Sequence, residues 1–319
     1  MINILANDGI DDSAKTLLEN KGFNVIDQKI EQNLLSEFIN QNNIEVIIVR
    51  SATQVRKDLI DKCNGLKIIA RAGVGTDNID VEYAKSKGIA VFNTPAASSQ
   101  SVAELVFAHI FALYRFLHQS NREMPVYGHE KFSELKKKYS KGREIKGKTI
   151  GIIGLGRIGT CVAEYAIRLG MNVLAYDPYV TKRDLVFQIA GQKITATINS
   201  VTLDEVLLHS DIVTLHVPKT SDGKPLLGEN ELTRLKPHAI IVNASRGGII
   251  DEQALINAVK NKQLMAAGLD VFVNEPKPNK EILQINEFSL TPHTGASTIE
   301  AQERIGVELA EQIIAFYQA

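Results

Sequence analysis

Three short segments in the last quarter of the chain carry side chains that together suit one kind of chemistry. Arg246, Glu275 and His293 each come shortly after an apolar run of the kind that forms a strand in a parallel sheet. A guanidinium grips a carboxylate through two parallel hydrogen bonds. A histidine takes a hydroxyl proton while hydride leaves the same carbon, and a carboxylate behind the imidazole orients it and stabilises its charged form. These residue types therefore suit the oxidation of a hydroxy acid.

Each of the three also has a simpler interpretation. An arginine, glutamate or histidine at a strand end commonly caps the strand or forms a salt bridge, and spacing alone does not show that the three meet. The carboxyl ends of strands in an open α/β sheet are nevertheless where ligands bind. We therefore expect a shared site at that edge.

A glycine-rich loop marks a second site. The segment Gly154-Leu-Gly156-Arg157-Ile158-Gly159 joins a predicted strand at 149–153 to a predicted helix that runs through Leu169. Gly154 permits a tight turn, Gly156 lets the backbone approach a pyrophosphate, and Gly159 lets the helix pack closely on the strand. The N–H groups at the helix N-terminus then face the phosphates. This context predicts a dinucleotide site.

The next predicted strand indicates which dinucleotide. It ends at Asp177, 18 residues after Gly159, where a carboxylate accepts hydrogen bonds from an adenosine ribose and repels a 2′-phosphate. We therefore expect NAD rather than NADP. Lys182 and Arg183 are nearby cations that suit NADP, but we interpret them as solvated surface residues.

Composition excludes several other classes of function. The chain has 319 residues, enough for two domains, and a formal net charge of −1, so no overall field attracts nucleic acid or an anionic membrane. Its two cysteines, Cys63 and Cys161, support neither a disulfide framework nor a metal site. We expect no metal, no signal peptide and no membrane span, and hence a cytoplasmic location.

Strand-like runs alternate with helical patterns throughout, which predicts an α/β protein with parallel sheets. Ser98 to Leu117 and Thr298 to Tyr317 are predicted to form long helices. Residues 121–148 are polar and rich in lysine, proline and glycine, and we expect a surface excursion that contacts a partner subunit or overhangs the active site. Residues 185–201 give no clear prediction. The predicted strands are 2–5, 25–26, 46–49, 67–70, 90–92, 149–153, 172–176, 211–215, 239–242, 265–269 and 288–290.

The order of the motifs resembles the D-isomer-specific 2-hydroxyacid dehydrogenases over essentially the whole chain. The matching segments are Arg71 to Asp80, Gly154 to Gly159, Leu215 to Pro218, Asn243 to Gly248, Asp270 to Pro276 and Pro292 to Ser297. By this resemblance Arg246 binds and polarises the substrate, His293 is the acid/base, and Glu275 supports His293. The resemblance also implies that the cofactor is contacted by the glycine loop, Asp177, His216, Val217, Pro218, Ala244, Asp270 and Gly295.

The resemblance implies an architecture as well. Residues 1–97 and 294–319 would form a flavodoxin-like substrate domain, and residues 98–293 a Rossmann-type NAD-binding domain inserted into it, both of them doubly wound. The chain would cross between the domains near Pro95 and near His293, and closure there would exclude water from the substrate. The long helices beside the crossings commonly build a homodimer interface in this family.

Within the family the chain most resembles the short members that oxidise D-3-phosphoglycerate, the first step of serine biosynthesis. Arg50 and Ser51 would bind the substrate phosphate, and the backbone of Val74 and Gly75 the carboxylate. The simpler interpretation of Arg50 is a surface arginine. Lys136 to Lys138 could add positive charge near the substrate, but their simpler interpretation is a solvated face. Ala96 to Ser99 stand where many phosphoglycerate enzymes have Asn-Gly-Asn-Ser. This difference leaves the identity of the hydroxy-acid substrate undecided.

Two other functions therefore remain as alternatives. One keeps the chemistry and changes the substrate, as in a glyoxylate/hydroxypyruvate reductase or another D-2-hydroxyacid dehydrogenase. The other is an NAD-sensing module of the corepressor type, which the intact set of Arg246, Glu275 and His293 disfavours. Because the sequence ends after one helix, we expect no C-terminal regulatory domain and no feedback by serine through one.

Overall fold

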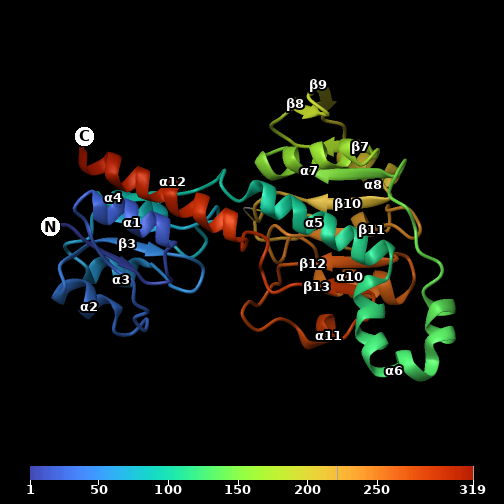
Figure 1. Ribbon diagram of the computed structural model, residues 1–319, viewed down its shortest axis with the longest axis horizontal. Helices are drawn as coiled ribbons and strands as arrows, with labels where there is room; N and C mark the ends of the chain where they lie inside the picture. Colours follow the sequence, from blue (N-terminus) through green and yellow to red (C-terminus); the bar gives the residue numbers. More distant parts are fainter. Residues whose placement is uncertain (221, 319) are drawn as a thin grey trace. The chain divides into compact units, whose positions relative to one another are not determined.

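The computed structural model describes residues 1–220 and 222–318, which divide into two compact units (Figure 1). The first consists of Met1–Ser101 and Ala296–Ala319, and the second of Val102–Gly295. The domain boundaries predicted from the sequence are 97/98 and 293/294. Both units contain a parallel sheet between helices, so the predicted α/β class is confirmed.

The first unit has a five-stranded parallel sheet with the order β2-β1-β3-β4-β5, which is the flavodoxin-like order. Its strands are β1 (Asn3–Ala6), β2 (Asn24–Ile26), β3 (Ile44–Val49), β4 (Ile68–Arg71) and β5 (Ala90–Asn93). Its helices are α1 (Asp12–Asn20), α2 (Leu35–Gln41), α3 (Lys57–Lys62), α4 (Val81–Ser86) and α12 (Ile299–Gln318).

Each face of this sheet is covered by helices that bury an apolar stripe. Helices α2, α3 and α4 contribute to the core on one face, and α1 and α12 to the core on the other. Gly306 of α12 allows its helix to pack closely on α1, because a Cβ there would stand 2.8 Å from the Cβ of Ala14. The C-terminal helix thus packs in the same unit as the N-terminal strands.

The second unit has a six-stranded parallel sheet with the order β13-β12-β11-β10-β6-β7. An isolated parallel bridge joins Ala175 in β7 to Ser200, beyond the last strand. If the bridge counts as a third strand, the order is the Rossmann 3-2-1-4-5-6 with one further strand. The strands are β6 (Thr149–Ile153), β7 (Asn172–Tyr176), β10 (Ile212–Leu215), β11 (Ile240–Asn243), β12 (Ala266–Leu269) and β13 (Phe288–Leu290).

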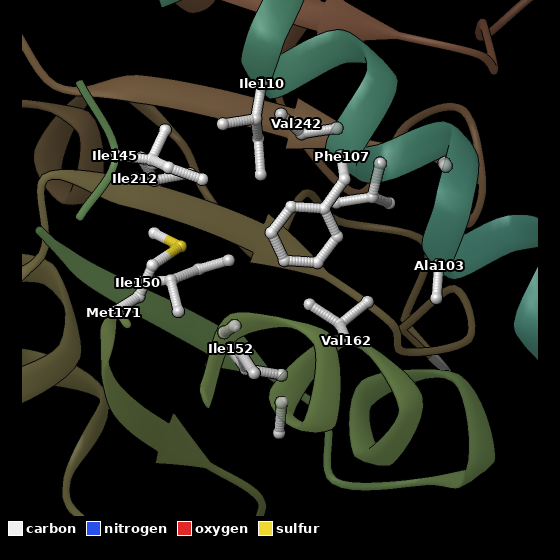
Figure 2. Packing of buried hydrophobic residues seen from close by; sticks show 14 of the residues in the cluster. Ala103, Phe107, Ile110, Ile145, Ile150, Ile152, Val162, Met171, Ile212 and Val242 are labelled. Carbon is white, nitrogen blue, oxygen red and sulfur yellow. The ribbon is translucent and has the colours of Figure 1, made fainter. Parts of the chain in front are cut away.

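Two layers of helices cover this sheet. Helices α5 (Ser99–Tyr114) and α7 (Arg157–Arg168) pack on one face, where Phe107 and Ile110 of α5 lie against Ile150 and Val242 (Figure 2). Helices α8 (Leu203–His209), α9 (Glu229–Leu232), α10 (Glu252–Lys260) and α11 (Lys280–Leu283) contribute to the core on the other face. The burial on both faces explains why the central strands are almost continuously apolar.

Residues 121–148, which we expect to form a surface excursion, are mostly exposed and largely helical. Residues up to Lys138 form helix α6 (Leu117–Lys138), and only the segment after it is irregular. The glutamates, lysines and leucines of this segment favour a helix despite Pro125 and Gly128. The helix has a kink at Lys131. Lys136 and Lys137 are exposed, and Lys138 pairs with Glu123, so this end of the helix is a solvated face.

The segment 185–201 belongs to an antiparallel hairpin of β8 (Lys182–Ile189) and β9 (Gln192–Asn199). Its two loop residues, Ala190 and Gly191, both have positive φ, as a type I′ turn requires. Asparagine or aspartate is the usual first residue of such a turn, so the alanine at this position does not indicate a turn in the sequence. Leu185, Phe187 and Ile198 bury one face of the hairpin in the core beneath α7.

Within the described residues, no single helix is long and apolar enough to span a membrane. Helices α5 and α6 reach the required length and composition only as a pair, and they are bent by 59° relative to each other. The buried side of α5 is part of the core of the second unit.

Candidate active site

The three candidate catalytic residues follow three neighbouring strands of the second unit. Arg246 comes after β11, Glu275 after β12 and His293 after β13. These strands are in register at their last residues, with Asn243 beside Leu269 and Leu269 beside Leu290. Because the strands are parallel, the segments that carry the three side chains all leave the same edge of the sheet.

His293 and Glu275 form a close pair. The Nδ1 atom of His293 lies 2.7 Å from Oε2 of Glu275, and Oε1 of Glu275 accepts a hydrogen bond from the backbone N–H of Phe272 at 2.9 Å. His293 has a left-handed backbone, with φ 56°, and its N–H donates to the Asp270 carbonyl at 2.8 Å. Both residues of the pair are therefore held by the main chain.

The pair remains accessible to solvent. The side chains of His293 and Glu275 are 41% and 34% exposed, respectively. Burial of Glu275 raises its pKa, but hydrogen bonds from His293 and from the Phe272 N–H, together with the positive charge of Arg246, outweigh that and lower it. A carboxylate that stays ionised holds the proton on Nδ1 of the imidazole, which leaves Nε2 to face a substrate.

Arg246 is set by a tight turn after β11. The Asn243 side chain accepts hydrogen bonds from the N–H and hydroxyl of Ser245 and donates one to the Arg246 carbonyl at 2.9 Å. A Cβ on Gly247 would stand 1.9 Å from the carbonyl oxygen of Phe272, so only glycine fits between this turn and the segment that leads to Glu275. The segments that carry Arg246 and Glu275 are thereby packed together.

The glycine loop has the geometry that a dinucleotide needs. Gly154 has a φ of +102°, and a Cβ on Gly159 would stand 1.9 Å from the Gly154 carbonyl oxygen, so both positions require glycine. At Gly156, the N-cap of α7, no other described atom lies within 4 Å of a Cβ position, which leaves the backbone open to a pyrophosphate. Arg157 and Ile158 begin the helix, whose first N–H groups face this space. The residues present therefore fit the cofactor.

Asp177 lies at the end of β7 against the glycine loop. Its Oδ2 accepts a hydrogen bond from the Leu155 N–H at 2.8 Å, and its Oδ1 accepts from the N–H groups of Tyr179 and Val180. Arg183, which we interpreted as a solvated residue, is instead half-buried and donates from Nη2 to the Leu155 carbonyl at 3.1 Å. The carboxylate and the guanidinium therefore contact the same loop residue. Lys182 is exposed, as expected.

His216, Val217 and Pro218 follow β10, and Ala244 follows β11, so they leave the same edge of the sheet. The carbonyl oxygen of His216 would stand 2.6 Å from a Cβ on Gly154, which places this segment against the glycine loop. The His216 ring is buried and bonds Thr214 Oγ1 at 3.0 Å through Nε2. Burial lowers its pKa to about 3, so the ring is neutral.

Asp270 is 1% exposed and is the most enclosed carboxylate of the candidate set. Its Oδ1 accepts from the Thr291 hydroxyl at 2.7 Å and from the Thr294 N–H at 2.8 Å. Its Oδ2 accepts from the Gly295 N–H at 2.9 Å. Asp270 thus anchors the loop that carries His293. The Thr291 hydroxyl also contacts a buried histidine, His109, which the sequence analysis did not identify.

The candidate substrate residues belong to the first unit. Arg50 and Ser51 line an open pocket of about 540 Å³ together with Asp8 and Lys29. Asp8 accepts hydrogen bonds from the N–H groups of Arg50 and Thr53 and pairs with Lys29 at 2.6 Å. The Nε atom of Arg50 is buried and has no hydrogen-bond partner in the part of the chain that the structure describes.

Val74 and Gly75 lie in the loop after β4, where the side chain of Asn93 donates to the Val74 carbonyl at 2.7 Å. For metals, no group of three histidine, cysteine, aspartate or glutamate side chains that suits an ion occurs among residues 1–220 and 222–318.

Comparison with known proteins identifies the family. Residues 107–295 match the model of the D-isomer specific 2-hydroxyacid dehydrogenase NAD-binding domain. A D-3-phosphoglycerate dehydrogenase from Methanocaldococcus jannaschii is 42% identical over 98% of this chain and 57% of its own length. A hydroxypyruvate reductase from Thermotoga maritima is also 42% identical, over 96% of this chain and 95% of its own.

The structural likeness agrees. The NAD⁺-bound 3-phosphoglycerate dehydrogenase of Entamoeba histolytica superposes with a TM-score of 0.77 and 27% identity, over 99% of this chain and 95% of that one. The chain spans about half the length of the curated relatives named D-3-phosphoglycerate dehydrogenase, between 46% and 57%. The chain belongs to the D-isomer-specific 2-hydroxyacid dehydrogenase family, and its second unit contains the family's NAD-binding domain.

Proposed function

We propose that this chain interconverts a D-2-hydroxy acid and its 2-oxo acid, with Arg246, Glu275 and His293 as the catalytic residues. The observation that carries the proposal is the 2.7 Å contact between His293 and Glu275. It lies in the same unit as Arg246 and a glycine loop shaped for a dinucleotide. NAD, when bound, accepts or supplies the hydride.

The residues of the chain supply everything else that the reaction needs. Arg246 holds the substrate carboxylate through paired hydrogen bonds, which fixes the carbon that loses hydride. Nε2 of His293 removes the hydroxyl proton in oxidation and returns it in reduction. Glu275 stabilises the imidazolium that forms in between, because it remains ionised.

We propose D-3-phosphoglycerate as the hydroxy acid and 3-phosphohydroxypyruvate as its product, which is the first step of serine biosynthesis. The pocket lined by Arg50 and Ser51 supports this choice, since a buried guanidinium atom without a described partner suits a phosphate. In this proposal the Val74–Gly75 backbone binds the carboxylate. The relatives named D-3-phosphoglycerate dehydrogenase also support it.

A hydroxypyruvate or glyoxylate reductase is the second candidate. The T. maritima hydroxypyruvate reductase is as similar as the M. jannaschii enzyme and matches this chain along nearly its whole length. The Ala96-Ala-Ser98-Ser99 segment, which departs from the phosphoglycerate pattern, also favours it.

We further propose a homodimer in the cytoplasm. Large apolar side chains are exposed along α5 and α6, an arrangement that a partner subunit would cover. They are Phe111, Leu117, Met124, Val126, Tyr127 and Phe132. Both cysteines are free, as is usual in a reducing compartment.

The test is NADH oxidation with 3-phosphohydroxypyruvate, hydroxypyruvate, glyoxylate and pyruvate, measured in parallel on one preparation. Preference for the phosphorylated acid supports the serine-pathway substrate. Preference for an unphosphorylated acid keeps the mechanism and replaces that substrate. Tight NADH binding without turnover of any of the four would overturn the enzyme proposal in favour of an NAD-sensing module.

A further inference from the structure

His109 is a buried histidine with a specific hydrogen-bonding position in the second unit. It lies in α5 and is 2% exposed. A Cβ on Gly268 of β12 would stand 2.8 Å from the Cβ of His109, so the absence of a side chain there makes room for the imidazole. The ring bonds the Ser289 hydroxyl at 2.9 Å through Nδ1 and the Thr291 hydroxyl at 3.1 Å through Nε2.

The direction of these hydrogen bonds follows from the carboxylate at the end of the chain of contacts. The Thr291 hydroxyl lies 2.7 Å from Oδ1 of Asp270 and donates its only proton to that oxygen. It must therefore accept the hydrogen bond from His109, which places the proton of a neutral ring on Nε2. Nδ1 then accepts from the Ser289 hydroxyl. Burial lowers the pKa of His109 to about 4, which agrees with a neutral ring of this one tautomer.

Asp270 connects these hydrogen bonds to the loop that carries His293. Besides Thr291, its carboxylate accepts the N–H groups of Thr294 and Gly295. Its carbonyl accepts the N–H of His293 at 2.8 Å. The hydrogen bonds therefore run from Ser289 through His109 and Thr291 to Asp270, which anchors the backbone of three consecutive residues beginning with the catalytic histidine.

We propose that His109 is a positioning residue for hydride transfer. Through Thr291 it fixes Asp270, and Asp270 fixes both the His293 loop and the amide of the nicotinamide. The role toward the nicotinamide rests on the proposed NAD-dependent function and on the family resemblance, which implies that Asp270 contacts the amide of the cofactor. The Asp270 oxygen that Thr291 does not contact, Oδ2, has accepting capacity left beyond the Gly295 N–H.

Two substitutions interrupt the chain of hydrogen bonds at different points. His109→Leu removes the ring, and Thr291→Val removes one hydroxyl with almost no change of shape, so it keeps the test valid if the first variant folds poorly. His109→Gln is the conservative variant, because its amide can still donate to Thr291. Phe107→Leu is the matched control, since Phe107 is also a buried residue of α5 but packs in the apolar core (Figure 2).

The measurements are kcat for the preferred 2-oxo acid and the Kd values of NADH and ADP-ribose, which lacks the nicotinamide. We expect His109→Leu and Thr291→Val to lower kcat by about 10- to 100-fold, the scale of a misplacement near 1 Å. Both should weaken NADH binding and leave ADP-ribose binding unchanged. His109→Gln should recover part of both losses, and Phe107→Leu should lower stability without this selective loss.

Two results would overturn the proposal. One is wild-type kcat and NADH affinity in both His109→Leu and Thr291→Val. The other is an equal loss of NADH and ADP-ribose affinity, which would indicate general damage to the unit. If the wild-type chain turns over none of the acids, the proposed function fails, but the comparison of NADH with ADP-ribose still decides whether His109 positions the nicotinamide.

Discussion

Nδ1 of His293 lies 2.7 Å from Oε2 of Glu275, so one nitrogen of the ring is committed to the carboxylate. Glu275 is in turn held by the N–H of Phe272. An imidazole fixed in this way exchanges a proton at Nε2 without changing tautomer. The arrangement suits a group that alternates between acid and base, and the first prediction follows from it.

Glu275→Gln should lower kcat by about 10- to 100-fold, because the imidazolium loses its counter-charge while the shape of the site is kept. The pKa of Glu275 is lowered, so in the wild type its carboxylate stays charged over the neutral pH range and stabilises the imidazolium there. In the variant, the pH at which 2-oxo acid reduction falls to half its maximum should move downward. Glu281→Gln, an exposed carboxylate paired with Lys260, is the control. Identical pH–rate profiles for Glu275→Gln and the wild type would refute the pairing role.

Arg50→Gln tests the proposed phosphate contact. The KM for 3-phosphohydroxypyruvate should rise by about 10-fold or more, the scale of one charged hydrogen-bonding contact, while the KM for hydroxypyruvate stays the same. Lys21→Gln removes the same charge from an exposed position of the same unit and should have no effect. A parallel rise for both substrates would show that Arg50 supports the fold of the unit and does not recognise phosphate.

Cofactor choice should depend on Asp177 and Arg183, which contact opposite sides of the Leu155 peptide groups. The wild type should prefer NADH, because Asp177 repels a 2′-phosphate. Asp177→Ser should raise kcat/KM for NADPH, and adding Arg183→Gln should reverse part of that gain by removing the neighbouring positive charge. Steady-state kinetics with both cofactors give the ratio. An unchanged NADPH/NADH ratio in Asp177→Ser would contradict the placement of the ribose.

Stability should depend on pH through the two buried histidines. His109 and His216 have pKa values lowered by burial to about 4 and about 3, against 6.5 for an ordinary histidine. Below pH 6.5 the unfolded chain therefore binds protons that the folded chain does not. The free energy of unfolding should fall from pH 6.5 toward pH 4, by about 1.4 kcal/mol per pH unit for each histidine.

Urea unfolding at pH 7 and at pH 5 measures this slope, in a range above the ordinary pKa of the carboxylates. His109→Gln should unfold with a smaller difference between the two pH values than the wild type. Equal differences would mean that His109 takes up its proton in the folded state.

Much of this organisation can be read from the sequence where local signals and packing agree. The strands at 149–153, 172–176 and 288–290 lie where apolar runs predict them. The glycine loop has the positive φ at Gly154 and the close packing at Gly159 that its spacing implies. At these positions the residue type is dictated by backbone geometry, so a pattern of few residues is enough.

The sequence allows no prediction where distant contacts decide the outcome. The turn at Ala190 and Gly191 has no local marker except its glycine. The role of His109 also has no local marker, because its partners Ser289 and Thr291 lie about 180 residues further along the chain. A single histidine in an apolar helix does not indicate that it is linked to the Asp270 carboxylate through Thr291.

His293→Asn tests the central claim most directly, because it removes the proton acceptor and keeps a polar side chain of similar size. We predict that kcat for the preferred 2-oxo acid falls by about 100- to 10,000-fold, the usual contribution of a general acid–base, while the Kd of NADH stays the same. That result would assign proton transfer to His293. Turnover at the wild-type rate in His293→Asn would contradict the account.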